Sequence, residues 1–335
     1  MPRIDPRIDP ELLEEEFDDV DTAHHRRRRG TKPSVKAQER IDDAEVARVV
    51  AVARGLLEVF HDRRRQPARF AGSMRGTKVV VGDRVGIRPA RHQTDVARVV
   101  SLLDRTSTLT RTPDDSDDTE RLVVANADMV AAVVSADRLE QSLGFVDRVM
   151  VAASAGSLAP MVVVNKVDLV ADDDVGDGLA TYRDLGVDIH LTSAETGAGV
   201  EALGDDLAGK WTAFTGHSGV GKSSLFNLLV PAADQAVADI GRHGGRHTTV
   251  AAVASHISER DAWLVDTPGI RSFGLGTVTP ASLARHFPEL ADLPCALDDC
   301  THLGEPGCGI DAAVIAPRRW DSYKRLHAAL ASGAP

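Results

Sequence analysis

A stretch from Gly216 to Ser224, GHSGVGKSS, combines three glycines with a lysine that is followed by two serines. Glycines at this spacing before a helix let backbone amides turn toward a phosphate group, and the start of the helix adds partial positive charge. We expect Lys222 to contact the β- and γ-phosphates of a nucleotide and Ser223 to bind Mg²⁺. The residues predicted to contact the phosphates are Gly216, His217, Ser218, Gly219, Val220, Gly221, Lys222, Ser223 and Ser224.

A second polar motif, NKVD at 165–168, indicates which base the nucleotide carries. The carboxylate of Asp168 can accept hydrogen bonds from both N1–H and the 2-amino group of guanine, whereas adenine has no such pair of donors. The segment TSA at 192–194 follows the next expected strand, and its last amide could donate to the guanine oxygen. We therefore predict guanine rather than adenine. The residues predicted to contact the base are Asn165, Lys166, Val167, Asp168, Ser193 and Ala194.

Two further motifs are typical of the triphosphate end of such a site. DTPG at 266–269 follows an apolar run, and an aspartate there usually belongs to the Mg²⁺ shell while the glycine amide meets the γ-phosphate. GRHTT at 245–249 supplies a threonine that could close over the ion, and we choose Thr248 over Thr249. The predicted magnesium ligands are thus Ser223, Thr248 and Asp266, with Gly269 at the γ-phosphate.

The group that activates the attacking water is less obvious. Ile270 follows DTPG, and its apolar side chain cannot orient water as a glutamine near this position does in other enzymes. We predict that His247 is the catalytic residue, because an imidazole can position or deprotonate water. The alternative is an exposed loop histidine that contacts a partner.

All three cysteines of the chain lie in one short segment, Cys295-x4-Cys300-x-His302-x5-Cys308. Three thiolates and one imidazole fill the four positions of a structural zinc ion and leave no open position for catalysis. The alternative is three reduced cysteines beside a chance histidine. An odd number of clustered cysteines does not indicate a disulfide framework.

The order of the motifs is unusual, because the base motif and TSA precede the phosphate loop, which precedes GRHTT and DTPG. A nucleotide-binding domain usually has the phosphate loop first. Each motif still follows an expected strand, and open α/β sheets bind ligands at the carboxyl ends of their strands. A circular permutation would therefore change the connectivity without moving the site. It would also place DTPG directly before the cysteine segment, so that the nucleotide state could act on the C-terminal region.

The elements expected to hold these motifs alternate from residue 121 onward, as in a doubly wound α/β fold with a mostly parallel sheet. We expect strands within 129–136, 161–164, 188–194, 211–216, 247–257 and 261–269. We expect helices within 137–153, 176–185, 199–209, 222–230 and 317–330.

The chain before residue 113 has a different composition. Residues 1–23 contain nine acidic residues and two arginines, whereas 24–112 contain 21 lysines and arginines against nine acidic residues. Short valine-rich runs broken by glycine predict a small basic β-barrel that touches a polyanion. The expected domains are a charged, disordered tail at 1–45, the barrel at 46–112, the nucleotide-binding domain at 113–275 and the zinc-binding domain at 276–335.

Targeting signals do not stand out in the sequence. No apolar run reaches the roughly 18 residues of a membrane span, and the N-terminus has no apolar signal region. We expect a cytoplasmic protein, and no feature of the sequence predicts a stable oligomer.

Together these motifs resemble the RsgA/YjeQ family of circularly permuted GTPases. The resemblance covers residues 75–330 and rests on VGDRV (81–85), LTR (109–111), VVNKVDL (163–169), GHSGVGKSSLFN (216–227), GRHTT (245–249), DTPGIRSF (266–273) and CTHLGEPGC (300–308). It implies an N-terminal OB-fold that contacts ribosomal RNA, a permuted GTPase domain and a C-terminal domain with one zinc ion. It also implies late maturation of the small ribosomal subunit, with GTP hydrolysed to GDP and phosphate under stimulation by that subunit, and His247 as the catalytic residue. The Arg-rich stretch DRRRQPARF (62–70) departs from the expected barrel and leaves its loop boundaries open.

Three hypotheses stay open at this point. The chain is a GTP-hydrolysing assembly factor that is released after hydrolysis, a binding module whose guanine nucleotide is mainly a state signal, or a zinc-dependent RNA-binding protein with a vestigial nucleotide site. The intact Lys222, Ser223 and Asp266 disfavour the third hypothesis.

Overall fold

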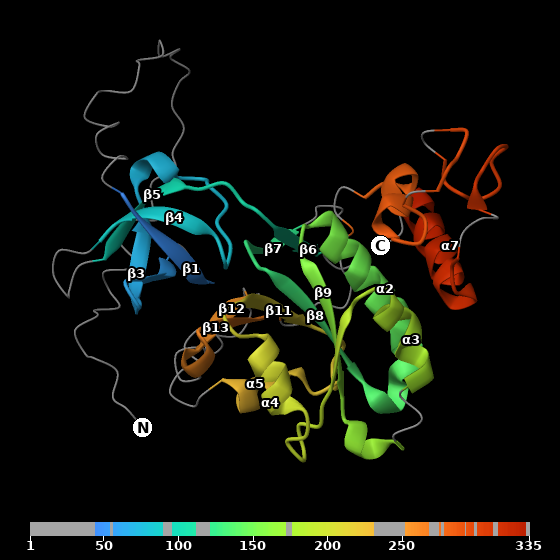
Figure 1. The fold of residues 1–335 in the computed structure, drawn as a ribbon. Helices are drawn as coiled ribbons and strands as arrows, with labels where there is room; N and C mark the ends of the chain where they lie inside the picture. Colours follow the sequence, from blue (N-terminus) through green and yellow to red (C-terminus); the bar gives the residue numbers. More distant parts are fainter. Residues whose placement is uncertain are drawn as a thin grey trace, which may run out of the picture. The chain divides into compact units, whose positions relative to one another are not determined.

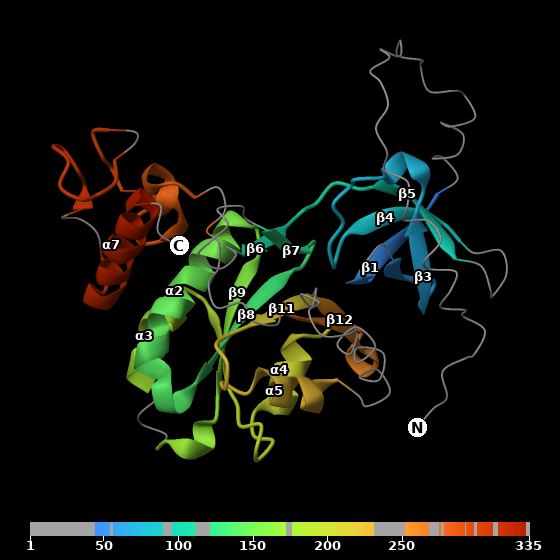
Figure 2. The ribbon, with the colours of Figure 1, turned by 180° about the vertical axis from the view of Figure 1, so that it is seen from behind.

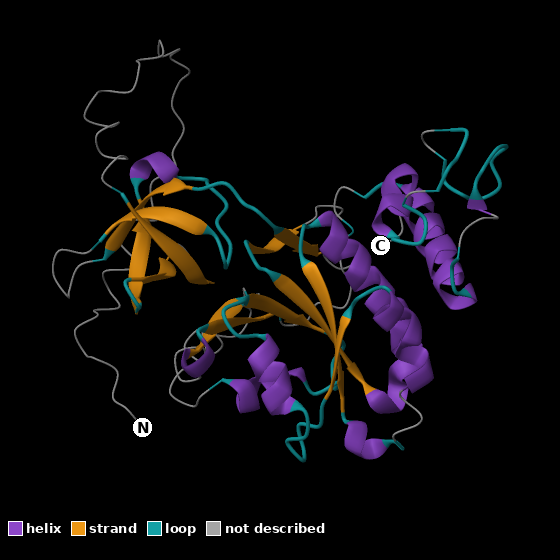
Figure 3. Ribbon diagram, in the orientation of Figure 1, coloured by secondary structure: helices purple, strands orange, loops and turns teal. Residues whose placement is uncertain are grey.

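A computed structural model shows the chain as a series of strands and helices (Figures 1 and 3). The structure describes residues 44–53, 56–89, 96–111, 121–171, 176–230, 252–267, 275, 278–291, 293–297, 300–310 and 314–332. The expected tail at 1–45 and the linker at 112–120 therefore lie almost wholly outside the described residues.

Eleven strands form one sheet in the order β10-β9-β8-β11-β13-β12-β1-β2-β3-β5-β4. The first six strands in this order belong to the α/β part, and all neighbours among them are parallel except β12 and β13. In chain order they are β8 (Met129–Ser135), β9 (Ala159–Asn165), β10 (Asp188–Leu191), β11 (Trp211–Thr215), β12 (Val253–Ile257) and β13 (Ala262–Asp266). The α/β class with a mostly parallel sheet is confirmed.

Helices cover both faces of this α/β sheet (Figures 1 and 2). Alternate residues of a strand point to opposite faces, and the two faces of β8 belong to two different buried clusters. Val130, Ala132 and Val134 lie in the cluster that contains residues of α2 (Leu139–Ala155) and α3 (Gly176–Asp184). The intervening residues of β8 lie in the cluster that contains residues of α4 (Val200–Asp206) and α5 (Lys222–Leu229). Burial on both sides explains why this strand reads as a continuous apolar run.

The N-terminal strands form a closed five-stranded barrel. β1 pairs with β2, β2 pairs with β3, and β3 pairs in parallel with β5. β5 pairs with β4, and β4 pairs with β1, so the ring is complete. The strands are β1 (Glu45–Ala53), β2 (Leu56–His61), β3 (Arg64–Phe70), β4 (Arg84–Arg88) and β5 (Ala97–Leu102), and the short helix η2 (Gly72–Met74) follows β3. Five strands in this arrangement are typical of an OB-fold, which confirms the expected barrel.

The Arg-rich stretch at 62–70 is mostly a strand. Asp62 and Arg63 both have positive φ, at 48° and 59°, and form the two-residue turn between β2 and β3. Two consecutive left-handed residues match the twist of antiparallel strands in a tight hairpin. The arginines of β3 therefore lie on a barrel strand, and the loop boundary left open by the sequence is the short turn before Arg64.

A small two-stranded sheet, β6 (Thr108–Arg111) and β7 (Arg121–Ala125), connects the barrel to the α/β part along the chain. Val81, which precedes β4, forms a bridge with Val124 of β7. Gly82 makes this approach possible, because its φ is +88° and a Cβ there would lie 1.9 Å from the carbonyl oxygen of Ala125.

The C-terminal region packs on α2 through a shared apolar core. The short helix η7 (Pro280–His286) begins with a capping box between Thr279 and Ser282, and α7 (Pro317–Ser332) is the last helix described. Phe287 and Tyr323 of this region lie in the same buried cluster as Val146 and Met150 of α2. Short helices η3 (Ala136–Arg138), η4 (Val167–Leu169) and η6 (Ser258–Arg260) complete the described elements.

Gly82→Ala should destabilise the protein more than Gly76→Ala. Both glycines have positive φ, but a Cβ at Gly76 would meet no atom within 4 Å. The left-handed backbone alone should cost about 1–2 kcal/mol of folding free energy at either position, and the overlap with Ala125 adds to this at Gly82. Denaturant unfolding followed by tryptophan fluorescence measures both. Equal unfolding midpoints for the two variants would contradict the close approach.

Candidate functional site

The phosphate loop lies over the carboxyl ends of the parallel strands. β11 leads into residues 216–221, and α5 begins at Lys222. Gly221 has a φ of +92°, and a Cβ there would lie 2.2 Å from Nδ2 of Asn165 at the end of β9. A side chain at this position would therefore push the phosphate loop away from the base motif.

Lys222 reaches back across the phosphate loop. Its ammonium donates to the carbonyl oxygens of Gly216 and His217, the second at 3.2 Å. Burial lowers the pKa of Lys222, while the negative charge of Asp266 acts in the opposite direction. Ser223 lies in the exposed first turn of α5. The ammonium is thus held at the mouth of the loop, where the phosphate contact was predicted.

Asp266 ends the strand that neighbours β11. It pairs with Phe214 in the parallel register, and the hydroxyl of the next residue, Thr267, donates to the Phe214 carbonyl at 2.6 Å. The start of DTPG is therefore anchored beside the strand that leads into the phosphate loop. The structure brings the predicted residues Lys222 and Asp266 to the same edge of the sheet.

Asn165 joins three loops through one side chain. Its Nδ2 donates to the carbonyl of Val220 in the phosphate loop at 2.9 Å. Its Oδ1 accepts from the Ala194 amide at 3.0 Å and from the Thr192 hydroxyl at 3.3 Å. Only 1 % of Asn165 is exposed. The base motif, the TSA segment and the phosphate loop are thus held together at one point.

The other residues of the base motif turn outward from Asn165. Lys166 adopts a left-handed backbone with a φ of 65°, and η4 begins at Val167, whose amide donates to the carbonyl of Thr192 at 3.2 Å. The carboxylate of Asp168 is exposed and accepts a hydrogen bond from the Ser193 hydroxyl. The two segments predicted to read the base therefore lie side by side.

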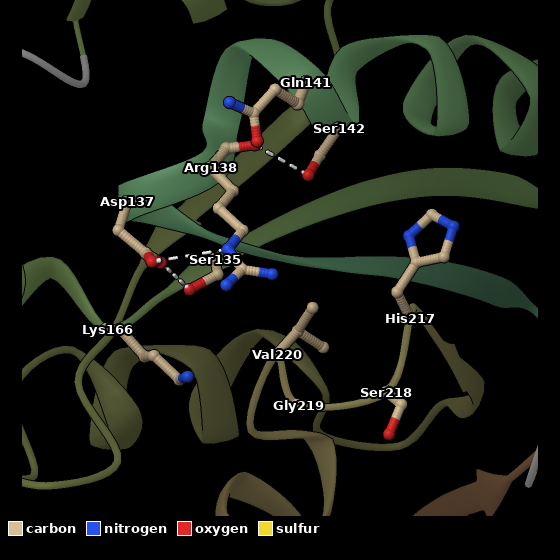
Figure 4. A pocket seen from close by; sticks show the side chains of 10 residues that line it. All are labelled: Ser135, Asp137, Arg138, Gln141, Ser142, Lys166, His217, Ser218, Gly219 and Val220. Atoms are coloured by element: carbon tan, nitrogen blue, oxygen red, sulfur yellow. Dashed lines mark hydrogen bonds and ion pairs between the residues drawn. The ribbon is translucent and has the colours of Figure 1, made fainter.

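A cavity of about 300 Å³ lies beside the phosphate loop (Figure 4). Lys166 and the loop residues His217, Ser218, Gly219 and Val220 line one part of it. Its other wall contains residues that the sequence did not indicate, namely Ser135, Asp137, Arg138, Gln141 and Ser142.

Ser135 ends β8 and the other four residues follow it, so their position is a consequence of the sheet. Ser135 is the register partner of Asn165 in the parallel pair β8–β9. The residues after Ser135 must therefore lie beside the base motif, and this was the signal that could have found them. The Ser135 hydroxyl donates to Asp137 and lowers the pKa of that carboxyl, and the charges of Arg138 and Lys166 add to the effect. An ionised carboxylate thus faces the lysine of the base motif.

The exposed side chain of His217 contacts helix α2. Its ring centroid lies 4.7 Å from that of Phe145 in α2. Partial desolvation lowers the pKa of His217, and the nearby charge of Lys222 lowers it further. His217 therefore connects the phosphate loop to α2 as an aromatic side chain.

Four metal-ligating side chains converge in the C-terminal region. Ligand atoms of Cys295, Cys300, His302 and Cys308 all lie within 4.8 Å of one another. Nδ1 of His302 is 3.4 Å from the sulfur of Cys295 and 3.5 Å from that of Cys308. Zinc bonds of about 2.3 Å to sulfur and about 2.0 Å to nitrogen at tetrahedral angles place such donors about 3.5 Å apart. The four residues can hold a metal ion, and they fit zinc.

The loop that carries these ligands is braced by a carboxylate and a tyrosine. Glu305 accepts hydrogen bonds from the hydroxyl and amide of Thr301 and from the Leu303 amide, the two amides at 2.8 Å. These bonds, led by that of the Thr301 hydroxyl, lower the pKa of Glu305 to about 2. The Tyr323 hydroxyl of α7 donates to the Thr301 carbonyl. Thr301 lies between the ligands Cys300 and His302, so α7 is attached directly to the ligand loop.

Three predicted residues lie outside the part of the chain that the structure describes: His247, Thr248 and Gly269. Their roles at the water, at Mg²⁺ and at the γ-phosphate stay predictions.

Comparisons with known proteins agree on one family. The model of the RsgA GTPase family matches residues 102–276. A protein of Gemmatimonas aurantiaca, named small ribosomal subunit biogenesis GTPase RsgA, is 37 % identical over 83 % of this chain and 95 % of its own length. A protein of Chlorobaculum tepidum with the same name is 38 % identical over 76 % of this chain and 86 % of its own.

Two solved structures share the fold. The crystal structure of YjeQ from Thermotoga maritima has a TM-score of 0.67 and 30 % identity, over 85 % of this chain and 98 % of that one. The structure of YloQ, described as a circularly permuted GTPase, has a TM-score of 0.67 over 88 % of this chain and 98 % of that one. Its 24 % identity shows the fold alone.

Asn165→Ala should weaken both the fold and the nucleotide site. It leaves the Val220 carbonyl and the Ala194 amide without their side-chain partner, and each such loss costs about 1–3 kcal/mol when the group stays buried. We expect a lower free energy of unfolding and a GDP dissociation constant raised at least about tenfold. Thr196→Ala in the neighbouring loop removes an exposed hydroxyl that, among the described residues, accepts only from the Ala198 amide, and it serves as the control. Unchanged GDP binding in Asn165→Ala would contradict the role of this side chain.

Proposed function

This chain belongs to the RsgA GTPase family, and from that premise we propose that it is a GTPase of small ribosomal subunit biogenesis. It would bind the small subunit during late maturation, hydrolyse GTP to GDP and phosphate, and leave after hydrolysis. The observation that carries the proposal is the meeting of base motif, TSA segment and phosphate loop at Asn165. The names of the relatives from Gemmatimonas and Chlorobaculum identify the small ribosomal subunit as the partner that we propose.

We assign the nucleotide contacts as the sequence predicted them. The phosphates would lie along residues 216–224, and guanine between Asp168 and Ala194. Ser223, Thr248 and Asp266 would bind Mg²⁺, which neutralises charge developing on the phosphates. Gly269 would donate to the γ-phosphate, and His247 would orient the attacking water.

We assign the barrel to RNA binding. Its described strands and turns carry exposed cations that would meet a phosphate backbone, which are Arg63, Arg64, Arg69, Arg75, Lys78 and Arg98. Binding that rests on such contacts weakens steeply with rising salt. The proposed division is a tail at 1–45, the barrel at 46–112, the GTPase domain at 113–275 and the zinc-binding domain at 276–335.

We further propose one zinc ion at Cys295, Cys300, His302 and Cys308, where it would cross-link the ligand loop. We propose that the protein is a monomer. We also propose that it is cytoplasmic, because it would act on ribosomal subunits. Every helix within the described ranges is too short or too polar to cross a lipid bilayer.

Small ribosomal subunits should accelerate GTP turnover, and His247→Ala should lose this stimulated rate by about 10²–10⁴-fold, the usual contribution of general acid–base catalysis. Phosphate release under single- and multiple-turnover conditions, with purified subunits and without them, measures the effect. Large subunits are the control. If small subunits bind but do not accelerate turnover, the nucleotide is mainly a state signal. If His247→Ala keeps the stimulated rate, the catalytic assignment is wrong.

Cys300→Ser should abolish stoichiometric zinc, because a serine hydroxyl replaces one of three thiolates. Metal analysis of purified protein measures the ratio of zinc to chain, and the wild type should give one. Ser332→Ala, at the far end of α7, is the control. One zinc per chain in Cys300→Ser would overturn the ligand set.

A further inference from the structure

A buried ion pair connects α2 of the GTPase part to α7 of the C-terminal region. Asp147, in the middle of α2, is fully buried, and the side chain of Arg319 is 1 % exposed. Nη1 of Arg319 donates to Oδ1 of Asp147 at 2.7 Å. Charges this deeply buried are stable only when each has close partners of opposite sign.

The partners form a closed, charge-balanced group. Nε and Nη2 of Arg319 donate to the two oxygens of Glu289 at 2.8 and 2.9 Å, as a two-pronged fork. Arg318 donates to the second oxygen of Asp147 at 3.2 Å and to the hydroxyl of Tyr182 in α3. Tyr182 in turn donates to Asp147 at 2.7 Å. Two guanidinium groups thus face two carboxylates, and loss of one member leaves a buried charge without compensation.

The same helix α7 is attached to the metal ligands one turn further on. Residues four apart lie on one face of a helix, and Tyr323 follows Arg319 at this spacing. Tyr323 packs edge-on against Phe287, with ring centroids 5.2 Å apart, and its hydroxyl donates to the Thr301 carbonyl between two ligands. One face of α7 therefore carries both the buried ion pair and the brace of the ligand loop.

Helix α2 contacts the phosphate loop in its first half. Phe145 packs against the ring of His217, and Gln141 and Ser142 line the cavity beside the loop. Asp147 lies two residues after Phe145 in the same rigid helix. A physical connection thus runs from the ligand loop through Tyr323, Arg319 and Asp147 to the wall of the nucleotide cavity.

We propose that Asp147 and Arg319 are positioning residues that fasten helix α2 to the metal-binding loop, so that metal bound at the loop stabilises the α2 wall of the nucleotide cavity. This inference rests on the zinc site proposed above. Metal would hold the ligand loop and, through Thr301 and Tyr323, the middle of α7. Without the metal, α7 shifts more easily and Asp147 loses the partner that its burial requires.

The competing explanation is that the shared apolar core alone holds the two regions together. Phe287, Tyr323 and Met150 would then keep α7 in place whatever happens at Asp147. The two explanations differ in one measurable respect, which is whether the response of α2 to the metal depends on the ion pair.

Hydrogen exchange of the full chain, read by mass spectrometry on peptides from 139–155, tests the proposal. Metal analysis comes first and must give one zinc per chain before chelation and none after it. In the wild type, zinc removal should speed exchange in α2 at least about tenfold, since breaking a buried pair has a large cost. In Asp147→Asn, α2 should exchange rapidly with zinc bound, and zinc removal should change its rate less than about twofold.

Two further variants keep the test decisive. Arg319→Lys keeps the charge but loses the fork, so it should retain an intermediate response to zinc, and it replaces Asp147→Asn if that variant does not fold. Arg260→Ala breaks exposed ion pairs to Glu201 and Asp205 elsewhere in the GTPase part and should respond as the wild type does.

Two results would overturn the proposal, namely α2 exchange that ignores zinc in the wild type, or a full zinc response in Asp147→Asn or Arg319→Lys. A wild-type chain that binds no zinc overturns the metal site itself, and metal analysis separates this failure from the others.

Discussion

One buried side-chain amide sets the relative positions of three loops. Asn165 donates to the phosphate loop at Val220 and accepts from Ala194 and Thr192. An amide with both ends paired is stable in the interior, whereas an unpaired end would cost about 1–3 kcal/mol. The close approach of the loops also restricts what the sequence can contain, and at Gly221 there is no space for a Cβ. The hydrogen bonds of Asn165 and the close approach at Gly221 therefore fix together how the three loops are arranged.

This constraint explains how the chain can be permuted and keep its site. Neighbouring strands decide which loop ends meet, and β9, β8, β11 and β13 are neighbours in that order whatever their order in the sequence. What the permutation changes is the surroundings of the sheet. In the sheet, β12 is the outermost strand of the α/β part on the side of the barrel. It pairs with β1 of the barrel in antiparallel fashion, at Ala51 and Val253. Pairing of this kind also removes an exposed sheet edge.

Local patterns predicted most of the α/β part, because each strand, helix and loop motif there carries its signal within a dozen residues. The strands at 129–136 and 211–216 and the helix at 317–330 differ from the observed elements by one or two residues. The sequence did not predict where the hairpin before Arg64 turns, because the turn has no glycine and consists of left-handed Asp62 and Arg63. The cavity wall from Ser135 to Ser142 was missed because its residues match no motif, and only the sheet register places them.

Contacts between distant parts of the chain were the least accessible to sequence reasoning. Asp147 and Arg319 are 172 residues apart, and each reads by itself as an ordinary charge on an amphipathic helix. The sequence suggested that the nucleotide state reaches the C-terminal region along the chain after DTPG. The structure adds packing as a second connection, because α2 touches the phosphate loop through Phe145 and the C-terminal region through Asp147. The C-terminal region is therefore held to the GTPase part by the same helix that contacts the phosphate loop.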